Sequence, residues 1–584
     1  MIDKNRWKAL VAERLEKIYR ESGKEGQLAE VVLQVPPKPE MGDLAFPLFM
    51  FAKSFGTSPN IIAQKLADDI NALEDKPMGQ AFAAGPYMNV KVNMNNMVNE
   101  LYDRIVAEGA SFGNTTSLKD KKIMVEFSGP NTNKPLHLGH VRNDSLGFSV
   151  SKILEANGAK VVKVNIINNR GVHICKSMLA YEKFGNGETP QSTGIKGDHF
   201  VGDYYVKFAQ WAKDDPTADS QAQEVLQKWE DGDPKVIELW KLMNGWTIDG
   251  IGQTYANMGI SFDKYYYESD TYKLGKDNVL EGLEKGVFQK AEDGAIYIDN
   301  SDIGLDKKIL LRKDGTSIYI TQDIGTAINR HKDWPFDSMI YVVASEQQYH
   351  FKVLFHVLDK LGYPWAKDLH HLSYGMVFLP EGKMKSREGN VVDADDLMKQ
   401  LSGMAKEEII EKGRDGELDN LDGTCHDIAL GAINYYMLQF DPVRDITFNP
   451  KESLSFNGNT GPYLQYMGAR ISSILRNFEE IKQAFNDVKF NSALLDNQDE
   501  REMIKAIGAY PETVEKAGKT FDPSLICTFL YDLSKRFSHW YHDNPVLKAE
   551  SRELVLARVN LCKMVLQTMK NAFALVGIPF LDKM

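Results

Sequence analysis

A strand, a tight turn and a helix that opens with two histidines restrict the fold of this chain more than any other feature. The apolar run Lys122–Phe127 predicts the strand, and His137-Leu138-Gly139-His140 stands at the expected start of the helix. A second apolar run, residues 161–167, follows that helix. Two such runs joined by a helix are typical of a βαβ unit with parallel strands. We therefore predict an α/β domain built on a parallel sheet.

The same turn predicts a nucleotide site. The N-terminal end of a helix offers N–H groups without helical partners and a partial positive charge, which favour phosphate. Gly139 would let a ring approach the backbone closely, and His137 and His140 can each donate a hydrogen bond to an anionic oxygen. Two surface histidines without a task are the alternative. Because a chance His-x-Gly-His is expected roughly 0.02 times in a chain of this composition, we favour the site.

Length and composition indicate a globular protein with several domains. The 584 residues suffice for roughly three or four domains. The 43% hydrophobic and 26% charged residues are typical of an ordinary globular protein. With no run as long as a membrane span, and an amphipathic pattern rather than a signal peptide at the start, we expect a cytoplasmic protein with no membrane partner. The four cysteines are widely spaced, which predicts neither a zinc site nor a disulfide framework.

The net charge of −12 is unevenly distributed. Residues 201–300 hold 10 Lys, no Arg and 19 Asp or Glu, which gives −9 in that segment. Residues 455–584 hold 16 Lys or Arg against 15 Asp or Glu, which is close to neutral. Because an RNA contact depends on the local field, an RNA-binding surface outside the acidic segment stays open.

The expected elements divide the chain into four parts. We expect residues 1–115 to form an α+β domain and residues 116–400 to form the α/β domain. An acidic insertion at about 185–300 should interrupt the sheet of the α/β domain. A helical connector (401–455) and a helical domain (456–584) follow.

Particular strands and one helix start are expected within these parts. Ser58 should cap a helix with Pro59 at its first position. Residues 31–35 and 87–92 are expected strands of the first domain. The second half of the α/β domain should continue through strands at 295–298, 318–320 and 339–343.

A basic segment between two glycines is the second candidate for a site. Lys383, Lys385 and Arg387 lie between Gly382 and Gly389. Such a loop can close over a polyphosphate and neutralise charge as pyrophosphate leaves. A cluster of this kind on its own is more often a solvated turn.

Together the two candidates resemble the HIGH and KMSKS signatures of class I aminoacyl-tRNA synthetases. The chain is similar to the arginyl-tRNA synthetase family over almost its whole length, and five further stretches carry this narrower resemblance: residues 126–134, 319–323, 345–350, 457–466 and 575–579. The resemblance implies a Rossmann-type catalytic domain with an insertion, an N-terminal α+β domain that contacts tRNA, and a C-terminal all-α domain that binds the anticodon.

The resemblance also implies an activity. ATP would activate L-arginine to arginyl-adenylate, and the arginyl group would pass to the 2′-OH of the terminal adenosine of tRNA(Arg), in protein biosynthesis. The implied partners are ATP, as a substrate, with Mg²⁺, L-arginine and tRNA(Arg). We expect a monomer, no zinc and no residue that serves as a metal ligand.

By resemblance, Glu126 and Asp323 take the guanidinium of arginine with Tyr319 beside them, and Asn131 and Gln347 hold its α-amino and carboxylate end. A planar cation with five donors does need fixed carboxylate acceptors. The alternatives are a solvated strand end for Glu126, a helix N-cap for Asp323 and a core position for Tyr319.

The residues expected to bind ATP are His137, Gly139, His140, His350, Lys383, Met384 and Lys385. The catalytic groups among the expected residues are Lys134, His137, His140 and Lys383. For His350, a place in the core is the alternative.

The chain departs from the family pattern at the second signature, where Ser386 stands in place of the second lysine. By resemblance Lys134 replaces that lysine, because something must neutralise the charge on the phosphates. A surface turn residue is the alternative interpretation of Lys134, and Lys385 is the alternative source of the charge. Residues 168–173 also depart from the D-W-G-x-Q of many relatives.

Three rival classes fit the sequence less well. A non-catalytic RNA-binding paralogue would lose site residues, whereas His137, His140, Glu126 and Asp323 remain. A small nucleotidyltransferase with a HIGH motif would lack the extra domains. A cysteinyl specificity would show zinc-ligand cysteines.

Overall fold

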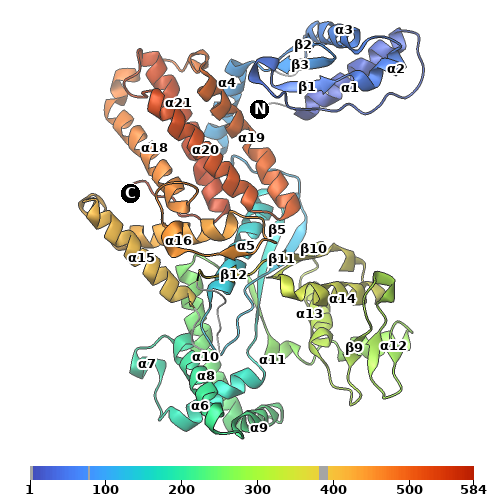
Figure 1. Cartoon of the computed structure of the whole chain (residues 1–584), viewed down its shortest axis with the longest axis vertical. Coiled ribbons are helices and arrows are strands. Elements are labelled where there is room, and N and C mark those ends of the chain that lie inside the picture. The colour runs from blue at the N-terminus through green and yellow to red at the C-terminus, as the bar shows by residue number, and fades with distance from the viewer. Residues whose placement is uncertain (1–3, 77–78, 381–391) are drawn as a thin grey trace. The chain divides into compact units, whose positions relative to one another are not determined.

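The computed structural model describes residues 4–76, 79–380 and 392–584 (Figure 1). The chain divides into two compact units. One unit comprises Met1–Phe112, Ser473–Tyr510 and Leu533–Thr568. The other comprises Gly113–Ser472, Pro511–Asp532 and Met569–Met584. The C-terminal helices therefore contribute to both units.

The first unit begins with a small α+β fold. Its antiparallel sheet has the order β1-β3-β2, and its elements are α1 (Lys4–Glu21), β1 (Leu44–Pro47), α2 (Ala52–Phe55), α3 (Pro59–Asn71), β2 (Gln80–Ala84) and β3 (Tyr87–Lys91). Ser58 caps α3 as predicted, since its side chain accepts a hydrogen bond from the N–H of Asn60 at 3.3 Å. The strand predicted at 31–35 is wrong. That segment makes only an isolated bridge, from Gln34 to Ala45 of β1. The strand that pairs with β3 at this side of the sheet is β1.

Helix α4 (Met94–Glu108) completes this unit together with parts of the C-terminal helices. Lys505 joins the small sheet domain to these helices through an ion pair of 2.6 Å with Asp43.

The second unit contains the predicted parallel sheet. Its five strands have the order β11-β10-β4-β5-β6, and every neighbouring pair is parallel. The strands are β4 (Lys122–Glu126), β5 (Lys160–Ile167), β6 (Lys264–Tyr267), β10 (Ser338–Ala344) and β11 (Leu369–Tyr374). Helix α5 (Leu138–Ala156) joins β4 to β5, so the βαβ unit and the Rossmann-type fold class are confirmed.

The order of the strands creates a crevice beside β4. The chain passes from β4 outward to β5 and β6, and then returns on the other side of β4 through β10 and β11. In parallel sheets, ligands bind at the carboxyl ends of the strands where the order reverses in this way. The histidine turn leads directly from that end of β4.

The connection from β5 to β6 is a helical subdomain with its own buried cluster. Its helices are α6 (Val172–Phe184), α7 (Pro190–Thr193), α8 (Gly197–Asp214), α9 (Ala218–Glu230) and α10 (Pro234–Asn257). Strand β6 then lies inside the segment predicted to interrupt the sheet. As an edge strand with three consecutive tyrosines, it lacks the apolar pattern that marks an interior strand.

Two further strand predictions of the α/β domain are corrected. Residues 296–298 do form a strand, β8, but it belongs to a separate antiparallel sheet with β7 (Gln289–Lys290) and β9 (Lys308–Leu311). Residues 318–320 instead cap and open helix α13 (Tyr319–Asp333). Short apolar runs do not distinguish a strand from the start of a buried helix. The strand predicted at 339–343 is confirmed as β10.

After residue 400 the described chain is almost entirely helical, as predicted. The helices of this region are α15 (Ala394–Glu411), α16 (Leu421–Leu438), α17 (Pro450–Ser453), α18 (Gly461–Ile481), α19 (Gln498–Thr520), α20 (Ser524–Asp543) and α21 (Arg552–Leu575). Earlier in the chain lie α11 (Glu268–Thr271), α12 (Lys276–Glu284) and α14 (Gln348–Lys360). One strand pair joins β12 (Val377–Phe378) to β13 (Ile446–Thr447) in parallel. Among the described residues, no helix combines the length and apolarity needed to cross a membrane.

A buried arginine of α5 anchors the chain around β12. Arg142 is fully buried, and its guanidinium donates hydrogen bonds to the carbonyls of Gly375 at 2.7 Å, Pro442 at 3.0 Å and Arg444 at 2.7 Å. These carbonyls belong to segments that β-pairing alone would hold weakly, because β12 and β13 are two residues long. Arg142 thus fixes the segment after β11 against α5.

Replacing Arg142 with Met should destabilise the second unit by about 3 kcal/mol, because buried carbonyls lose a charged donor. Urea unfolding followed by tryptophan fluorescence measures this effect. Arg20→Met is the matched control, since Arg20 is 74% exposed in its ion pair with Glu16, and it should change stability by less than about 0.5 kcal/mol. Equal effects of the two changes would contradict the anchoring role.

Candidate active site

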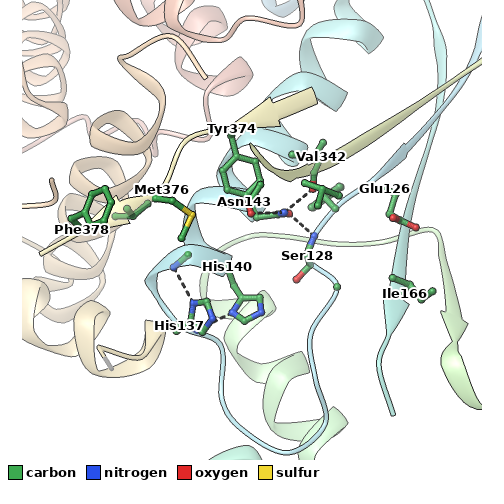
Figure 2. A pocket seen from close by; sticks show the side chains of 16 residues that line it. Glu126, Ser128, His137, His140, Asn143, Ile166, Val342, Tyr374, Met376 and Phe378 are labelled. Carbon is green, nitrogen blue, oxygen red and sulfur yellow. Dashed lines mark hydrogen bonds between the residues drawn. The ribbon is translucent and has the colours of Figure 1, made fainter. Parts of the chain in front are cut away.

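A cavity of about 430 Å³ lies at the carboxyl ends of the parallel strands (Figure 2). Strand β4 contributes Glu126 and the residues that follow it, and β10 contributes residues 342–344. The histidine turn and the segment after β11 complete the lining, with His137, Gly139, His140, Asn143, Tyr374, Met376 and Phe378. The cavity therefore occupies the crevice that the strand order predicts.

The turn after β4 bends sharply to reach the histidines. Ser128 and Gly129 have φ values of 78° and 63°, and the first of these is uncommon for a residue with a side chain. Asn143 accepts a hydrogen bond from the N–H of Ser128 at 2.6 Å, and Tyr255 contacts the Ser128 hydroxyl at 2.6 Å. These buried contacts compensate for the strained backbone.

The two histidines cap α5 reciprocally. The Nδ1 atom of His137 accepts a hydrogen bond from the N–H of Gly139 at 3.1 Å, and Nδ1 of His140 accepts one from the N–H of His137 at 3.1 Å. With Nδ1 used as an acceptor, each neutral ring carries its proton on Nε2. Each histidine therefore keeps one N–H donor for a ligand.

This capping corrects the expectation of free N–H groups at the start of α5. In addition to the two bonds to the rings, the N–H of Leu138 donates to the carbonyl of Val392 at 3.2 Å, and that of His140 donates to the carbonyl of His137 at 2.7 Å. Ligand contacts here consequently fall to side chains. Gly139 has a local task as well, because a Cβ there would lie 2.9 Å from the ring of His137.

Burial keeps both imidazoles neutral. Burial and the nearby charge of Lys134 lower the pKa of His137 to about 4, and burial lowers the pKa of His140 well below its ordinary value. Burial also lowers the pKa of Lys134. At this turn the neutral histidines can therefore donate hydrogen bonds, and Lys134 is the neighbouring cation.

Lys134 precedes the histidine turn and lines two further cavities. It lines a cavity of about 490 Å³ together with His137, Lys207 and Asp393. It also lines a polar cavity of about 870 Å³ with Asn131, Tyr319, and residues 168 and 170–174. The structure thus brings Lys134, His137 and His140 together. Lys383, Met384 and Lys385 lie outside the described residues.

The two carboxylates expected to bind arginine each have a partner in the protein. Glu126 pairs with Arg330, a buried residue of α13. Asp323 lies on the same helix, and its Oδ2 is 2.6 Å from Nε2 of His350. His350 therefore contacts a residue that is expected to bind arginine and does not line the 430 Å³ cavity, so its assignment to ATP stays a prediction.

The other residues expected for arginine are more exposed. Tyr319 is 77% exposed at the first position of α13. Gln347 is exposed in a short 3₁₀ segment directly after β10 and lines none of the three cavities described above. Their roles toward arginine stay predictions.

Sequence reasoning missed Arg330 and Asn143. Arg330 follows Asp323 by seven residues, or two helical turns, so the two share a face of α13. This spacing does not show that Arg330 pairs with Glu126, because Glu126 lies about 200 residues earlier in the chain. Asn143 follows His140 by three residues and donates to the carbonyl of Val342 at 2.7 Å, which links α5 to β10.

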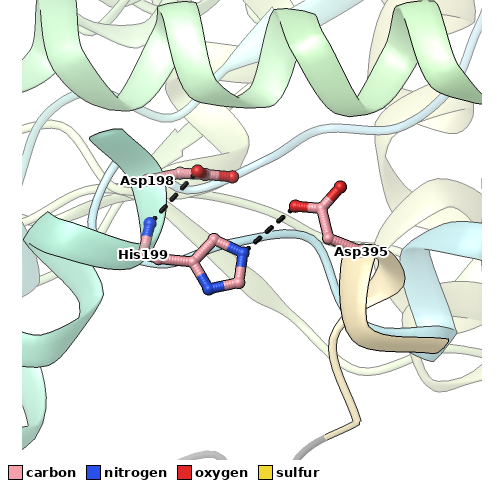
Figure 3. Close-up of side chains that lie close together, drawn as sticks. All are labelled: Asp198, His199 and Asp395. Atoms are coloured by element: carbon pink, nitrogen blue, oxygen red, sulfur yellow. Dashed lines mark hydrogen bonds and ion pairs between the residues drawn. The ribbon is translucent and has the colours of Figure 1, made fainter. Parts of the chain in front are cut away.

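A polar cluster joins the helical subdomain to the start of α15 (Figure 3). Asp198, His199 and Asp395 place ligand atoms within 4.8 Å of one another, which is a possible arrangement for a metal ion. However, the ammonium of Lys196 already donates to Asp198 at 3.0 Å and to Asp395 at 2.6 Å. A lysine thus occupies the place of a cation.

The start of α15 also lies beside the histidine turn. Asp393 forms a β-bridge with His137, and the N–H of Ala394 donates to the carbonyl of Leu136 at 2.9 Å. Nε2 of His199 lies 3.1 Å from Oδ2 of Asp395. That contact raises the pKa of His199, although burial opposes it.

Comparisons with known proteins identify the class of this fold and site. Residues 102–450 match the family model for tRNA synthetases class I (R), catalytic domain. Residues 464–584 match the DALR anticodon binding domain, and residues 5–92 match the arginyl tRNA synthetase N terminal domain. The parallel sheet and its histidine turn are thus those of a class I tRNA synthetase.

Individual relatives narrow the family. The chain is 54% identical to the arginine–tRNA ligase of Treponema denticola over 100% of this chain and 99% of that protein, and 51% identical to that of Treponema pallidum over 99% of each. The solved arginyl-tRNA synthetase of Thermus thermophilus shares the fold, with a TM-score of 0.78, 24% identity and 100% coverage of both chains. The chain belongs to the arginyl-tRNA synthetase family.

The raised pKa of His199 predicts a pH-dependent stability. Its contact with Asp395 stabilises the folded state fully below the unfolded pKa of about 6.5, and this stabilisation is lost as the pH rises through the folded value. His199→Gln should therefore lower the thermal midpoint more at pH 6 than at pH 8.5, as measured by calorimetry.

His542→Gln is the control, because His542 pairs with Asp543 but has a side chain that is 86% exposed. It should shift the midpoint equally at both pH values. A pH-independent effect of His199→Gln would show that protonation of His199 contributes nothing.

Proposed function

We propose that this chain joins L-arginine to tRNA(Arg) in protein biosynthesis. ATP activates arginine to arginyl-adenylate, and the arginyl group then passes to the 2′-OH of the terminal adenosine. The observation that carries the proposal is the cavity in which Glu126 and the paired histidines share one sheet edge. Relatives 54% and 51% identical over essentially the full chain, both named arginine–tRNA ligase, support it.

The proposed arrangement of substrates follows the length of the cavity. Figure 2 shows Phe378 and Glu126 at opposite sides, with the two histidines between them in this view. Adenine would lie against Met376 and Phe378, the α-phosphate near the histidines, and the arginine side chain toward Glu126. This order matches that of an aminoacyl-adenylate, in which phosphate joins the nucleoside to the amino acid.

Activation needs positioning and charge stabilisation more than proton transfer. The carboxylate of arginine attacks the α-phosphate in line, the bond from the α-phosphate to the bridging oxygen breaks, and pyrophosphate leaves. The Nε2–H groups of His137 and His140 donate to phosphate oxygens, and Lys134 neutralises the charge that develops. Lys383 is proposed to act from the basic segment.

Mg²⁺ belongs to the proposal as a companion of ATP. This ion keeps several waters and binds mainly through substrate phosphates, with one or two carboxylates. Asp203 and Asp393 line the same cavity as Lys134 and His137, so either carboxylate could contact the ion. The ion would neutralise phosphate charge.

Arginine recognition is proposed to depend on Glu126 and Asp323, with Tyr319 beside them. Carboxylates can accept two parallel hydrogen bonds from a planar guanidinium, which the ammonium of lysine cannot supply. Asn131 and Gln347 would hold the α-amino and carboxylate groups. Residues 1–115 and 456–584 are proposed to contact tRNA, the latter at the anticodon.

The proposed function predicts ATP–pyrophosphate exchange that requires L-arginine. Purified protein should catalyse exchange with arginine in the presence of tRNA(Arg), and with lysine at a rate at least about 100-fold lower. The measurement is incorporation of labelled pyrophosphate into ATP with each amino acid in turn. Faster exchange with another amino acid would refute the assignment.

Lys134→Ala should slow adenylate formation by about 10²- to 10³-fold, because the phosphates lose a positioned charge. Single-turnover formation of arginyl-adenylate measures the step. Lys207→Met is the matched control, since Lys207 lines the same 490 Å³ cavity but lies over the ring of Tyr204 at 4.3 Å. A near-normal rate for Lys134→Ala would transfer the role to Lys385.

A further inference from the structure

We propose that Arg330 is a positioning residue for the substrate. It holds the carboxylate of Glu126 from the core side, so that Glu126 presents its other side, ionised, to the guanidinium of arginine in the cavity. This inference rests on the proposed function, because it assigns a partner to a residue that the function uses.

The geometry separates the two sides of Glu126. Glu126 lines the 430 Å³ cavity, whereas Arg330 does not. Arg330 is 2% exposed, pairs with Glu126 and lies over the ring of Tyr266 with 4.8 Å from Cζ to the ring centroid. It is therefore held in the core between α13, β4 and β6, and does not occupy the place of a ligand.

The charges explain why such a partner is needed. Burial raises the pKa of Glu126, the positive charge of Arg330 lowers it, and the negative charge of Asp323 raises it. Although burial alone would lower the pKa of Arg330, the carboxylate of Glu126 leaves it raised, so this arginine stays charged. Two neighbouring carboxylates without a fixed cation would share a proton, and a protonated Glu126 could not attract a guanidinium.

Among the described groups named below, Arg330 is the cation and Asp323 the second carboxylate that act on Glu126. Helix α13 contributes Arg330 and Asp323, and β10 contributes Tyr341, which is paired in register with Glu126. Burial raises the pKa of Tyr341, so its hydroxyl stays neutral. Val164 faces from β5, and Tyr266 of β6 lies against Arg330. His350 of α14 contacts Asp323 of α13 and not Glu126.

Arg330→Met tests the proposal because Met keeps the length of the side chain and removes its charge. We expect the KM for arginine to rise about 30-fold at pH 7, with the KM for ATP changed less than about twofold. The KM for arginine should also fall as the pH rises from 6 to 9, because Glu126 must first lose its proton. Exchange kinetics at each pH measure both constants.

Arg330→Lys is the conservative variant. It restores a point charge without the planar fork, so the KM for arginine should rise only about fivefold and without the new pH dependence. Lys332→Met is the matched control on the same helix, since Lys332 is exposed, and it should leave both KM values unchanged. Circular dichroism and the thermal midpoint establish that each variant is folded.

A folded Arg330→Met with the wild-type KM for arginine across the pH range would overturn the proposal. So would equal increases in the KM for arginine and for ATP without a pH dependence, which a purely structural role produces. If Arg330→Met does not fold, Arg330→Lys decides, and an unchanged KM for arginine in it overturns the proposal.

Failure of the proposed function has a different signature. Wild-type protein would then show no arginine-dependent exchange, or Glu126→Gln would leave the KM for arginine unchanged. If wild-type protein shows arginine-dependent exchange and Glu126→Gln raises the KM for arginine, the Arg330 variants test the positioning role alone.

Discussion

The position of β4 between β5 and β10 is the constraint on which the site depends. The chain adds β5 and β6 on one side of β4 and β10 and β11 on the other side. The backbone after Glu126 therefore enters a crevice and not a packed helix. The turn at Ser128 and Gly129 then carries the chain to α5, whose first residues return to the same crevice. Acid, histidines and the end of β10 meet there because parallel strands end at a common edge.

Burial controls the chemistry at this edge. It keeps the imidazoles of His137 and His140 neutral, and backbone N–H groups fix their protons on Nε2. These rings can therefore donate hydrogen bonds through Nε2, and Lys134 is the neighbouring cation. At the other end of the cavity the same burial would neutralise Glu126, and Arg330 opposes that effect.

Several parts of the fold and site were predictable because they depend on local pattern. The βαβ unit, the capped helix after Ser58 and the helical region after residue 400 follow from apolar periodicity and start signals. The strand at 318–320 was wrong because three apolar residues fit a strand and a buried helix equally well. β6 was missed because an edge strand needs no apolar pattern on both faces.

The sequence by itself determined which chemical groups are present: paired histidines, a lysine shortly before them, and the carboxylates of Glu126 and Asp323. Tertiary structure decided their state. Only packing shows that the N–H groups at the start of α5 are already bonded, or that Glu126 and Arg330 lie side by side. The physical reason is that burial and charge pairing depend on residues far apart in the chain, which a linear pattern does not record.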